Sequence, residues 1–553
     1  MQNLSVLRPS ELIYLPSAHQ HRVLKWLMVW LAALFLSGCA SLPSGVSRPV
    51  STALANPSQT KMGQLVQARA AKAGTRNDSG FALVGNAELA FTSRMTLIKA
   101  AQKTLDIQYY AIFADDTTER LFDALREAAH RGVRVRILLD DFNTSGKNAQ
   151  VLKLAFEKNF ELRLFNPLPG GRSSMVLRIL ANLKDMARIQ RRMHNKMLVA
   201  DNAVAITGGR NLGETYFGQS EGTNFVDIDV LASGRIVRDL SKSFDSYWNN
   251  PLAYSVQSLM TAQEIEALKP PPTVPGESHS AAWPAVADPA SPPQDPTAAP
   301  SLPDSTDLSL LTWTWAPSVL LVDQASKIAA DADDVAEAKE TAVDGLLHIM
   351  SRAKTDLLIV SPYFVPGKDM MEQFADLRRR GVQIRVLTNS LASNDAPAAH
   401  VGYARYREAL VAMGIELYEM RAEQQGTVRG FGSGLGSKGE TSGGSRASLH
   451  AKVVVIDDRL LVVGSMNLDL RSKLQNSEVA IVIRNRAVAR EAATLINPAL
   501  THGAYQVILA NGQLVWRAPQ GSDLQDSTTE PDASLALKLL LTLIGPLAPD
   551  EML

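Results

Sequence analysis

Apolar and polar positions follow the same order in two parts of the chain. The first part is predicted to hold a helix over residues 93–103, a strand over 105–110, a helix over 118–131 and a strand over 133–139. In the second part, Arg-Gly-Val-Gln-Ile-Arg-Val-Leu at residues 380–387 repeats Arg-Gly-Val-Arg-Val-Arg-Ile-Leu at residues 131–138. A helix over 369–379 and a strand over 357–360 occupy the matching places. Copies about 250 residues apart predict a duplicated α/β unit.

Three segments have a composition that does not support a packed core. Residues 261–310 hold 11 of the 28 prolines and are predicted to be an extended linker. Residues 42–80 are rich in Ser, Ala, Gly and Thr and are predicted to be a tether. Eight glycines fall within residues 426–445, which are either a surface loop or a gate over the active site.

The N-terminal region has the pattern of an export signal. Basic residues up to Lys25 precede an apolar run over residues 26–35, and Leu-Ser-Gly-Cys ends at Cys39. This resembles a bacterial lipobox, which implies a signal peptide over residues 1–38 and a lipid anchor on Cys39. The protein is therefore expected to be exported and membrane-associated, facing the periplasm, at either the inner or the outer membrane. The alternative is an uncleaved N-terminal anchor.

Composition limits the partners and the chemistry. Lys plus Arg and Asp plus Glu both number 56, and this balance argues against a nucleic-acid partner, which usually requires a basic excess. Cys39 is the only cysteine, so no intramolecular disulfide forms. No metal-ligand spacing occurs near the motifs described next, and no metal or cofactor is expected.

Two short stretches carry the same residues at the same spacing. They contain, in order, His194, Lys196, Asp201 and Asn211, and His450, Lys452, Asp457 and Asn467. A period of two places each histidine beside its lysine on one face of a strand, and the apolar residues that follow are typical of a buried strand. Two such strands, each with an imidazole and an ammonium, predict a phosphate site with two histidines.

This pair of stretches resembles the HKD signature of the phospholipase D superfamily, from about Phe81 to Val515. The order of segments is most similar to bacterial cardiolipin synthases of the C type. The resemblance implies two duplicated phospholipase D-like α/β sandwich domains, related by a pseudo-two-fold axis, with the active site at their interface. The expected divisions are a tether over 39–80, a first domain over 81–252, a Pro-rich linker over 253–318, a second domain over 319–515 and a tail with a short apolar helix over 516–553.

Two histidines suit a phosphodiester substrate, because one can attack phosphorus while the other protonates the leaving oxygen. By resemblance, His194 is the nucleophile and His450 the general acid and base, although spacing alone does not assign these roles. The side chains expected to bind the phosphate oxygens are Lys196, Lys452, Asn211 and Asn467.

Four carboxylates accompany the motifs. Asp227 and Glu478 follow the motif histidines of their own halves by 33 and 28 residues, and are predicted to orient those histidines. Asp201 and Asp457 belong to the motif and count among its catalytic residues by resemblance. Their strand period, however, places them off the histidine face, which indicates a bracing role in the fold.

The predicted function is transfer of a phosphatidyl group through a phosphohistidine, making cardiolipin from phosphatidylglycerol and a second phospholipid, with phosphatidylethanolamine as candidate. The alternative is a phospholipase D or other phosphodiesterase that hydrolyses the same bond in lipid or nucleic acid.

Three further segments are candidate lipid contacts. Residues 174–192 form a basic amphipathic pattern that indicates either membrane contact or a domain-packing helix, and residues 534–544 are a short apolar run. Residues 389–407 follow a strand end, where they form either a headgroup pocket or an ordinary loop and helix start. Phospholipids and a membrane surface are therefore the expected partners.

Overall fold

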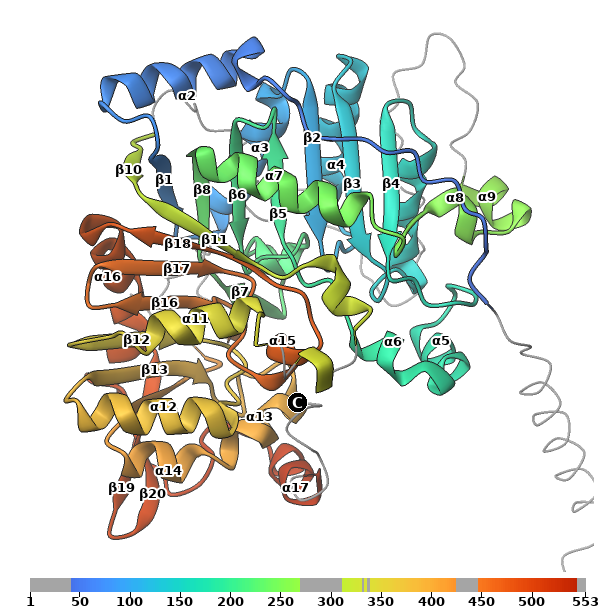
Figure 1. The fold of residues 1–553 in the computed structure, drawn as a ribbon. Coiled ribbons are helices and arrows are strands. Elements are labelled where there is room, and N and C mark those ends of the chain that lie inside the picture. Colours follow the sequence, from blue (N-terminus) through green and yellow to red (C-terminus); the bar gives the residue numbers. More distant parts are fainter. Residues whose placement is uncertain (1–40, 269–310, 331–332, 336–338, 424–445, 545–553) are drawn as a thin grey trace, which may run out of the picture.

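The computed structural model describes residues 41–268, 311–330, 333–335, 339–423 and 446–544. These residues form two nine-stranded mixed sheets with helices packed on them (Figure 1). Within the described ranges, no helix has both the length and the apolar character needed to cross a bilayer.

The first sheet belongs mainly to the first half of the chain. Its strands, from edge to edge, are β10 (Thr314–Ala316), β1 (Ser79–Val84), β8 (Asp229–Gly234), β6 (Val204–Gly208), β5 (Met197–Ala200), β2 (Thr104–Tyr109), β3 (Arg134–Asp140), β4 (Phe160–Phe165) and β9 (Ala253–Ser255). The main helices are α3 (Ala87–Ala100), α4 (Asp116–His130) and α7 (Arg235–Trp248). Asp115 and Thr118 form a capping box that fixes the start of α4.

The second sheet repeats this arrangement. Its strands are β11 (Ser318–Val322), β18 (Val479–Arg484), β17 (Leu460–Gly464), β16 (Val453–Ile456), β12 (Asp356–Val360), β13 (Gln383–Asn389), β14 (Glu416–Met420), β19 (Ala504–Ala510) and β20 (Gln513–Arg517). The main helices are α11 (Ala342–Met350), α12 (Gly367–Arg379) and α16 (Arg486–His502). In both sheets, three adjacent parallel strands are flanked by antiparallel ones. The predicted duplicated α/β fold is confirmed.

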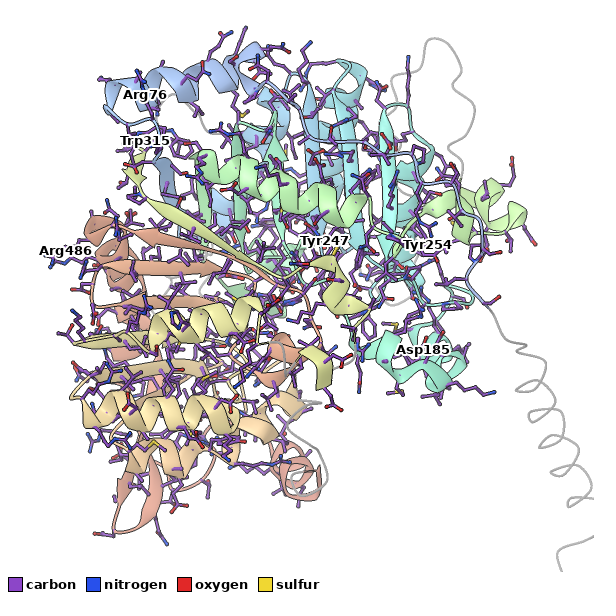
Figure 2. The ribbon with its side chains drawn as sticks, in the orientation of Figure 1. Arg76, Asp185, Tyr247, Tyr254, Trp315 and Arg486 are labelled. Atoms are coloured by element: carbon purple, nitrogen blue, oxygen red, sulfur yellow. The ribbon has the colours of Figure 1, made fainter. Side chains whose placement is uncertain are left out.

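One apolar core joins the two halves. It combines one face of β5 and β8 and the buried side of α7 with residues of β16, β17, β18 and α16. The opposite face of each sheet packs against its own helices, α3 and α4 in the first half and α11 and α12 in the second. Tyr247, at the junction in Figure 2, donates a hydrogen bond of 2.8 Å to the carbonyl of Asp323. The halves are therefore packed as one body.

The predicted domain boundaries are wrong at two points. Residues 253–318 were expected to be a linker, but β9, α8 (Val256–Leu259) and α9 (Ala262–Leu268) pack on the first half, and β10 pairs with β1. The second domain was expected to end at residue 515, but β20 pairs with β19 up to Arg517. The tail then carries the apolar helix α17 (Leu535–Ile544).

The predicted tether is also wrong for the described residues after position 40. Residues 48–54 form a strap along the first half. The strap is held in place because its backbone carbonyls accept hydrogen bonds from arginines of the first sheet. Arg136 donates to the carbonyl of Ser51 at 2.9 Å, and Arg163 donates to that of Pro49 at 2.6 Å. Helix α2 (Lys61–Lys72) follows, capped by the side chain of Thr60.

Candidate active site

The two motif histidines stand at the starts of equivalent strands. His194 precedes β5 and His450 precedes β16, and both strands are buried between antiparallel neighbours. Lys196 Nζ donates to the carbonyl of His194 at 2.9 Å, and Lys452 Nζ donates to that of His450 at 2.6 Å. Each strand thus presents an imidazole and an ammonium together, as the spacing predicts.

Backbone hydrogen bonds between the halves bring these strands together. The amide of His194 donates to the carbonyl of Ser477 at 2.9 Å, and the amide of His450 donates to that of Val226 at 2.8 Å. Strand β15 (Arg446–Leu449), which leads to His450, pairs in parallel with β7 (Thr223–Val226) of the first half. Each histidine is therefore held against the chain segment of the opposite half.

The carboxylate partners are exchanged between the halves. His194 Nδ1 lies 3.0 Å from both oxygens of Glu478, and His450 Nδ1 lies 2.9 Å from Oδ2 of Asp227. The prediction that each carboxylate orients the histidine of its own half is wrong. The reason is the backbone pairing, since Ser477 and Val226 immediately precede Glu478 and Asp227.

The two carboxylates have different surroundings. Glu478 accepts hydrogen bonds from the hydroxyls of Ser465 at 2.5 Å and Ser472 at 3.0 Å. Burial raises its pKa, but His194 and Lys196 outweigh this effect and hold the pKa below its ordinary value. Burial raises the pKa of Asp227 to about 7, because Arg210 and Lys452 offset it only in part.

Burial favours the neutral form of both histidine rings. Burial lowers the pKa of His194 to about 4, although Glu478 acts in the opposite direction. The pKa of His450 is also well below its ordinary value, because of burial and then of the charges of Lys452 and Lys196. A neutral ring whose Nδ1 faces a carboxylate presents Nε2 for chemistry. Lys452 also lowers the pKa of His194, so the pKa of each histidine is lowered by a lysine of the opposite half.

The spacing of the small residues and asparagines, which both motifs share, has a geometric basis. A Cβ on Gly209 would lie 2.5 Å from Oδ2 of Asp227 and 2.8 Å from the carbonyl of His450, so no side chain fits there. The second motif has Ser465 at this place, which contacts Glu478. The amide oxygen of Asn467 is buried and has no hydrogen-bond partner among the described residues. Both observations indicate a tightly built polar site.

Aromatic residues that the motif does not include complete the site in the first half. The ring of Tyr110 lies edge-on to that of His194, with 5.1 Å between centroids, and Lys196 Nζ lies 5.5 Å from the Tyr110 centroid. In the second half, Lys452 Nζ lies 6.0 Å from the ring of Tyr363. Tyr110 is the last residue of the strand predicted over 105–110. Its position at a strand end was the only sequence signal that could have marked it as a site residue.

His450 is packed by aromatic rings of the first half. The centroids of Tyr216 and Phe225 lie 5.2 and 5.0 Å from its ring. Asn211 Nδ2 donates to the hydroxyl of Tyr216 at 2.9 Å, so the motif asparagine positions this ring. Sequence reasoning missed these residues, because a contact between halves leaves no local pattern.

Asp201 and Asp457 are not at the reaction centre, which corrects their assignment as catalytic residues. Asp201 follows β5 at the end opposite His194 and accepts hydrogen bonds from the amides of Lys103 at 2.7 Å and Thr104 at 3.0 Å. Asp457 accepts equivalent bonds from the backbone amides of Lys354 at 3.0 Å, Thr355 at 2.8 Å and Asp356 at 3.1 Å. Both have left-handed backbones, with φ of 52°. They hold the turns that lead into β2 and β12.

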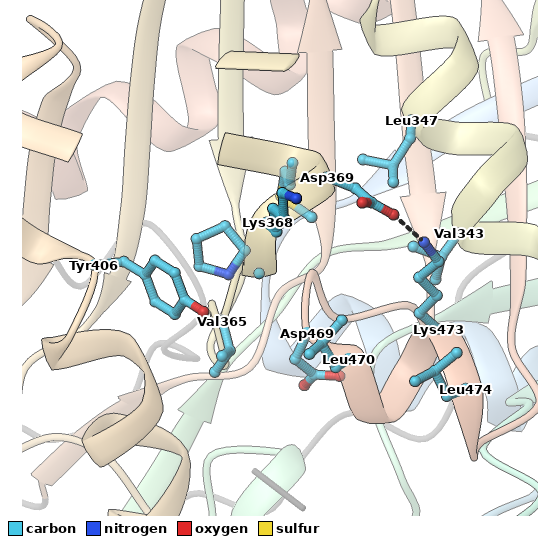
Figure 3. Close-up of a pocket in the computed structure, with 13 residues that line it drawn as sticks. Val343, Leu347, Val365, Lys368, Asp369, Tyr406, Asp469, Leu470, Lys473 and Leu474 are labelled. Atoms are coloured by element: carbon cyan, nitrogen blue, oxygen red, sulfur yellow. Dashed lines mark hydrogen bonds and ion pairs between the residues drawn. The ribbon is translucent and has the colours of Figure 1, made fainter. Parts of the chain in front are cut away.

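Most of the predicted headgroup segment faces the protein interior. His400 and Arg407 are buried, and Arg407 forms ion pairs with Glu419 and Glu530, each at 2.8 Å. Tyr406 instead lines a cavity of about 360 Å³, together with Asp469 and Lys473 (Figure 3). Neither motif histidine lines this cavity.

Two predicted features, Cys39 and the glycine-rich segment 426–445, lie outside the described residues. Whether the first is lipidated and the second closes over the site stays a prediction.

Comparisons with known proteins agree with this site. Residues 95–248 and 346–498 match the family model "Cardiolipin synthase, PLD-like domain". The chain is 38% identical over 404 residues to cardiolipin synthase C of Escherichia coli (strain K12), covering 72% of this chain and 80% of that protein. It is 30% identical over 525 residues to an uncharacterized protein of Helicobacter pylori (strain ATCC 700392 / 26695), covering 94% and 98%.

A solved structure shows the same fold. The crystal structure of phosphatidylserine synthase from Haemophilus influenzae Rd KW20 superposes with a TM-score of 0.55 at 13% identity, covering 88% of this chain and 100% of that one. Two family domains, each with its histidine–lysine strand, lie in one described body. The chain therefore belongs to the phospholipase D-like enzymes of the cardiolipin synthase type.

Proposed function

We propose that the protein is a phosphatidyltransferase that makes cardiolipin from phosphatidylglycerol and a second phospholipid, with phosphatidylethanolamine as the candidate donor. The observation that carries this proposal is the pair of imidazoles, each held at Nδ1 by a carboxylate of the opposite half. The identity with a cardiolipin synthase supports the lipid substrate.

In the first step, Nε2 of His194 attacks phosphorus and forms an N–P bond while the bond to the leaving oxygen breaks. The pair formed by Asp227 and His450 supplies a proton, which passes from Nε2 of His450 to that oxygen while Asp227 returns a proton to Nδ1, so the headgroup leaves as an alcohol. Lys196 and Lys452 offset the charge on the non-bridging oxygens in the transition state, together with the amides of Asn211 and Asn467.

In the second step, His450 takes the proton of the terminal hydroxyl of phosphatidylglycerol. The new alkoxide attacks phosphorus, the N–P bond breaks, and His194 regains its lone pair. The acceptor proton then resides on His450, so the pair is ready for the next donor. Water in place of the lipid alcohol would give phosphatidic acid, which is the hydrolytic alternative.

The unequal carboxylates support His194 as the nucleophile. Glu478 has a pKa below its ordinary value and stays ionised, which leaves a free lone pair on Nε2 of His194. The pKa of Asp227 is about 7, so the pair formed by Asp227 and His450 holds an exchangeable proton near neutral pH. A proton store of this kind suits a general acid.

We also propose that the chain is exported and anchored through Cys39, facing the periplasm, with the bilayer as its working surface. The apolar run and the Leu-Ser-Gly-Cys sequence support this location.

Product analysis tests the proposed reaction. Purified enzyme with phosphatidylethanolamine and phosphatidylglycerol is expected to release ethanolamine and form cardiolipin. Phosphatidic acid as the sole lipid product would identify a hydrolase instead.

The assignment of the histidines has a separate test with an activated donor, phosphatidyl-p-nitrophenol, whose leaving group needs no acid. His450→Ala is expected to release one equivalent of p-nitrophenol and then stop with a phosphohistidine at residue 194. His194→Ala is expected to give no burst. The reverse pattern would exchange the two roles.

A further inference from the structure

The segment that precedes the first catalytic strand has its apolar side chains facing outward. It consists of α5 (Met175–Ala181), a short 3₁₀ turn (Leu183–Asp185) and α6 (Met186–Gln190). Of the ten large apolar side chains that are exposed among the described residues, five lie here: Val176 (66% exposed), Leu177 (59%), Leu180 (49%), Leu183 (50%) and Met186 (40%). Such a cluster is unusual on a surface that contacts only water.

The inward side of α5 is polar, while α6 buries one apolar side chain, Ile189. Arg178 is 1% exposed and forms an ion pair with Asp141, and its Nη2 donates to the carbonyl of Leu168 at 2.9 Å. Asn182 Nδ2 donates to the carbonyl of Pro169 at 2.9 Å. A helix that packs on a core turns its apolar face inward, and α5 does the opposite. The outward face is therefore built for an apolar medium.

The anchor of this segment is joined to the reaction centre. Asp141 follows β3 directly, and its neighbour Asp140 accepts a hydrogen bond of 2.8 Å from the amide of Met193. Met193 immediately precedes His194. The outward apolar face is thus fixed in position relative to the nucleophile.

Two further features bear on the surroundings of this segment. In Figure 1, the described N-terminal strap begins on the right-hand side of the view, where α5 and α6 project, and α17 lies lower and further left, against α13 (Pro397–Ala404) of the second half. Leu535 and Leu539 of α17 are 74% and 55% exposed. Lys184 is also exposed on the projecting segment, near Asp185, which Figure 2 labels. A lysine beside an apolar face suits a bilayer with anionic headgroups.

We infer that α5 and α6, with the turn between them, insert into the interfacial layer of a phospholipid bilayer, as a membrane contact separate from the anchor at Cys39. This inference rests on the proposed function only in that the substrate lies in a membrane. The contact places the His194 strand beside the lipid surface. The phosphate of a donor lipid can then reach His194 while the acyl chains stay in the bilayer.

Fluorescence quenching in the full chain tests this contact. Because Cys39 is the only cysteine, a Cys39→Ser chain with Leu180→Cys carries one thiol for a polarity-sensitive dye. The matched control is Val319→Cys in the same chain, since Val319 is 61% exposed on β11. Vesicles of phosphatidylethanolamine and phosphatidylglycerol carry a nitroxide quencher on their acyl chains. We expect several-fold stronger quenching at position 180 than at position 319.

Equal quenching at the two positions would overturn the inference. A second outcome would also overturn it. If the dye emission at position 180 shifts to the blue without vesicles, and the shift grows with protein concentration, a second copy of the chain covers this face.

Activity gives a second measurement. Leu177→Gln with Leu180→Gln is expected to lower turnover of vesicular phospholipid by on the order of tenfold or more, since two leucines are lost from the apolar phase. Turnover of dispersed short-chain phospholipid is expected to change less than about twofold, and Val319→Gln is expected to change neither. Equal losses on both substrates would indicate a merely structural role. A parent enzyme without transferase activity would refute the proposed reaction, while the quenching result would still decide the membrane contact.

Discussion

At the scale of single residues, the main feature is that each histidine takes its carboxylate from the other half. The sequence identified all four residues, because the two motifs repeat and a carboxylate follows each one. It could not identify the pairs, since a separation of 33 or 28 residues fits a contact within one half equally well. The exchange follows from backbone bonds of His194 to Ser477 and of His450 to Val226.

The exchanged pairs predict which step each carboxylate supports. Glu478→Gln should slow the burst from phosphatidyl-p-nitrophenol by about 10²- to 10⁴-fold, because the ring of His194 loses its anionic partner. Asp227→Asn should leave the burst and slow the release of the phosphatidyl group from His194. Rapid-quench measurement of the burst and of the following phase separates the two variants. The opposite assignment of defects would mean that each carboxylate acts within its own half.

The raised pKa of Asp227 predicts an alkaline limit to the natural reaction. The proton shared by Asp227 and His450 is present below about pH 7 and is lost as the pH rises through that value, so kcat should fall above it. The activated donor needs no acid, and its burst should lack this limit. Parallel pH profiles with phosphatidylethanolamine and phosphatidyl-p-nitrophenol check this. A burst that falls with the same midpoint would assign the titration to another group.

At the scale of elements, strands and helices with a clear period were predicted close to their bounds, as α4 and α12 show. The helix expected over residues 174–192 was not, because it is interrupted at Asn182 and its arginines do not share one exposed face. Arg178 turns inward to Asp141, and Arg192 lies 3.3 Å from Asp140. Periodicity describes which residues share a face, but the partner of that face is set by tertiary contacts.

The turn held by Asp457 should matter for stability and not for chemistry. Asp457→Asn weakens three backbone hydrogen bonds and is expected to lower the free energy of unfolding by about 1–3 kcal/mol, with kcat nearly unchanged. Chemical denaturation followed by circular dichroism measures the first quantity. The control is Asp458→Asn, since Asp458 has a similar backbone, with φ of 49°, but a half-exposed side chain whose ion-pair partner, Arg490, is on the surface. A large loss of kcat in a folded Asp457→Asn protein would return this residue to the catalytic set.

At the scale of the whole molecule, duplication could be predicted from the repeated runs, but the common core could not. Alternating strands show that a sheet has a buried face, and they do not show that this face meets the other half. Here α7 touches β11, the edge strand of the second sheet, and α16 touches β1, which lies next to the edge strand of the first sheet. The active site depends on this packing, because it lies at the same interface.

Because the halves share a core, cleavage of the chain between them is expected to leave them associated and active. A protease site placed near residue 290 should be cleaved while the fragments stay together through the core and through pairing of β10 with β1. Size-exclusion chromatography after cleavage should show one species with about the parent's activity. The control is an enzyme with the same site left uncut. Separation into two inactive fragments would show that the covalent connection holds the halves together.

The position of β10 in the first sheet has a consequence for how the chain folds. Trp315, labelled in Figure 2, pairs with Gly80 across 235 positions of sequence, so the edge of the first sheet stays open until residues 314–316 reach the compartment in which the chain folds. The N-terminal half therefore finishes folding only when the start of the C-terminal half is present. A chain truncated before that strand should expose the edge of β1 and be a preferred client of chaperones.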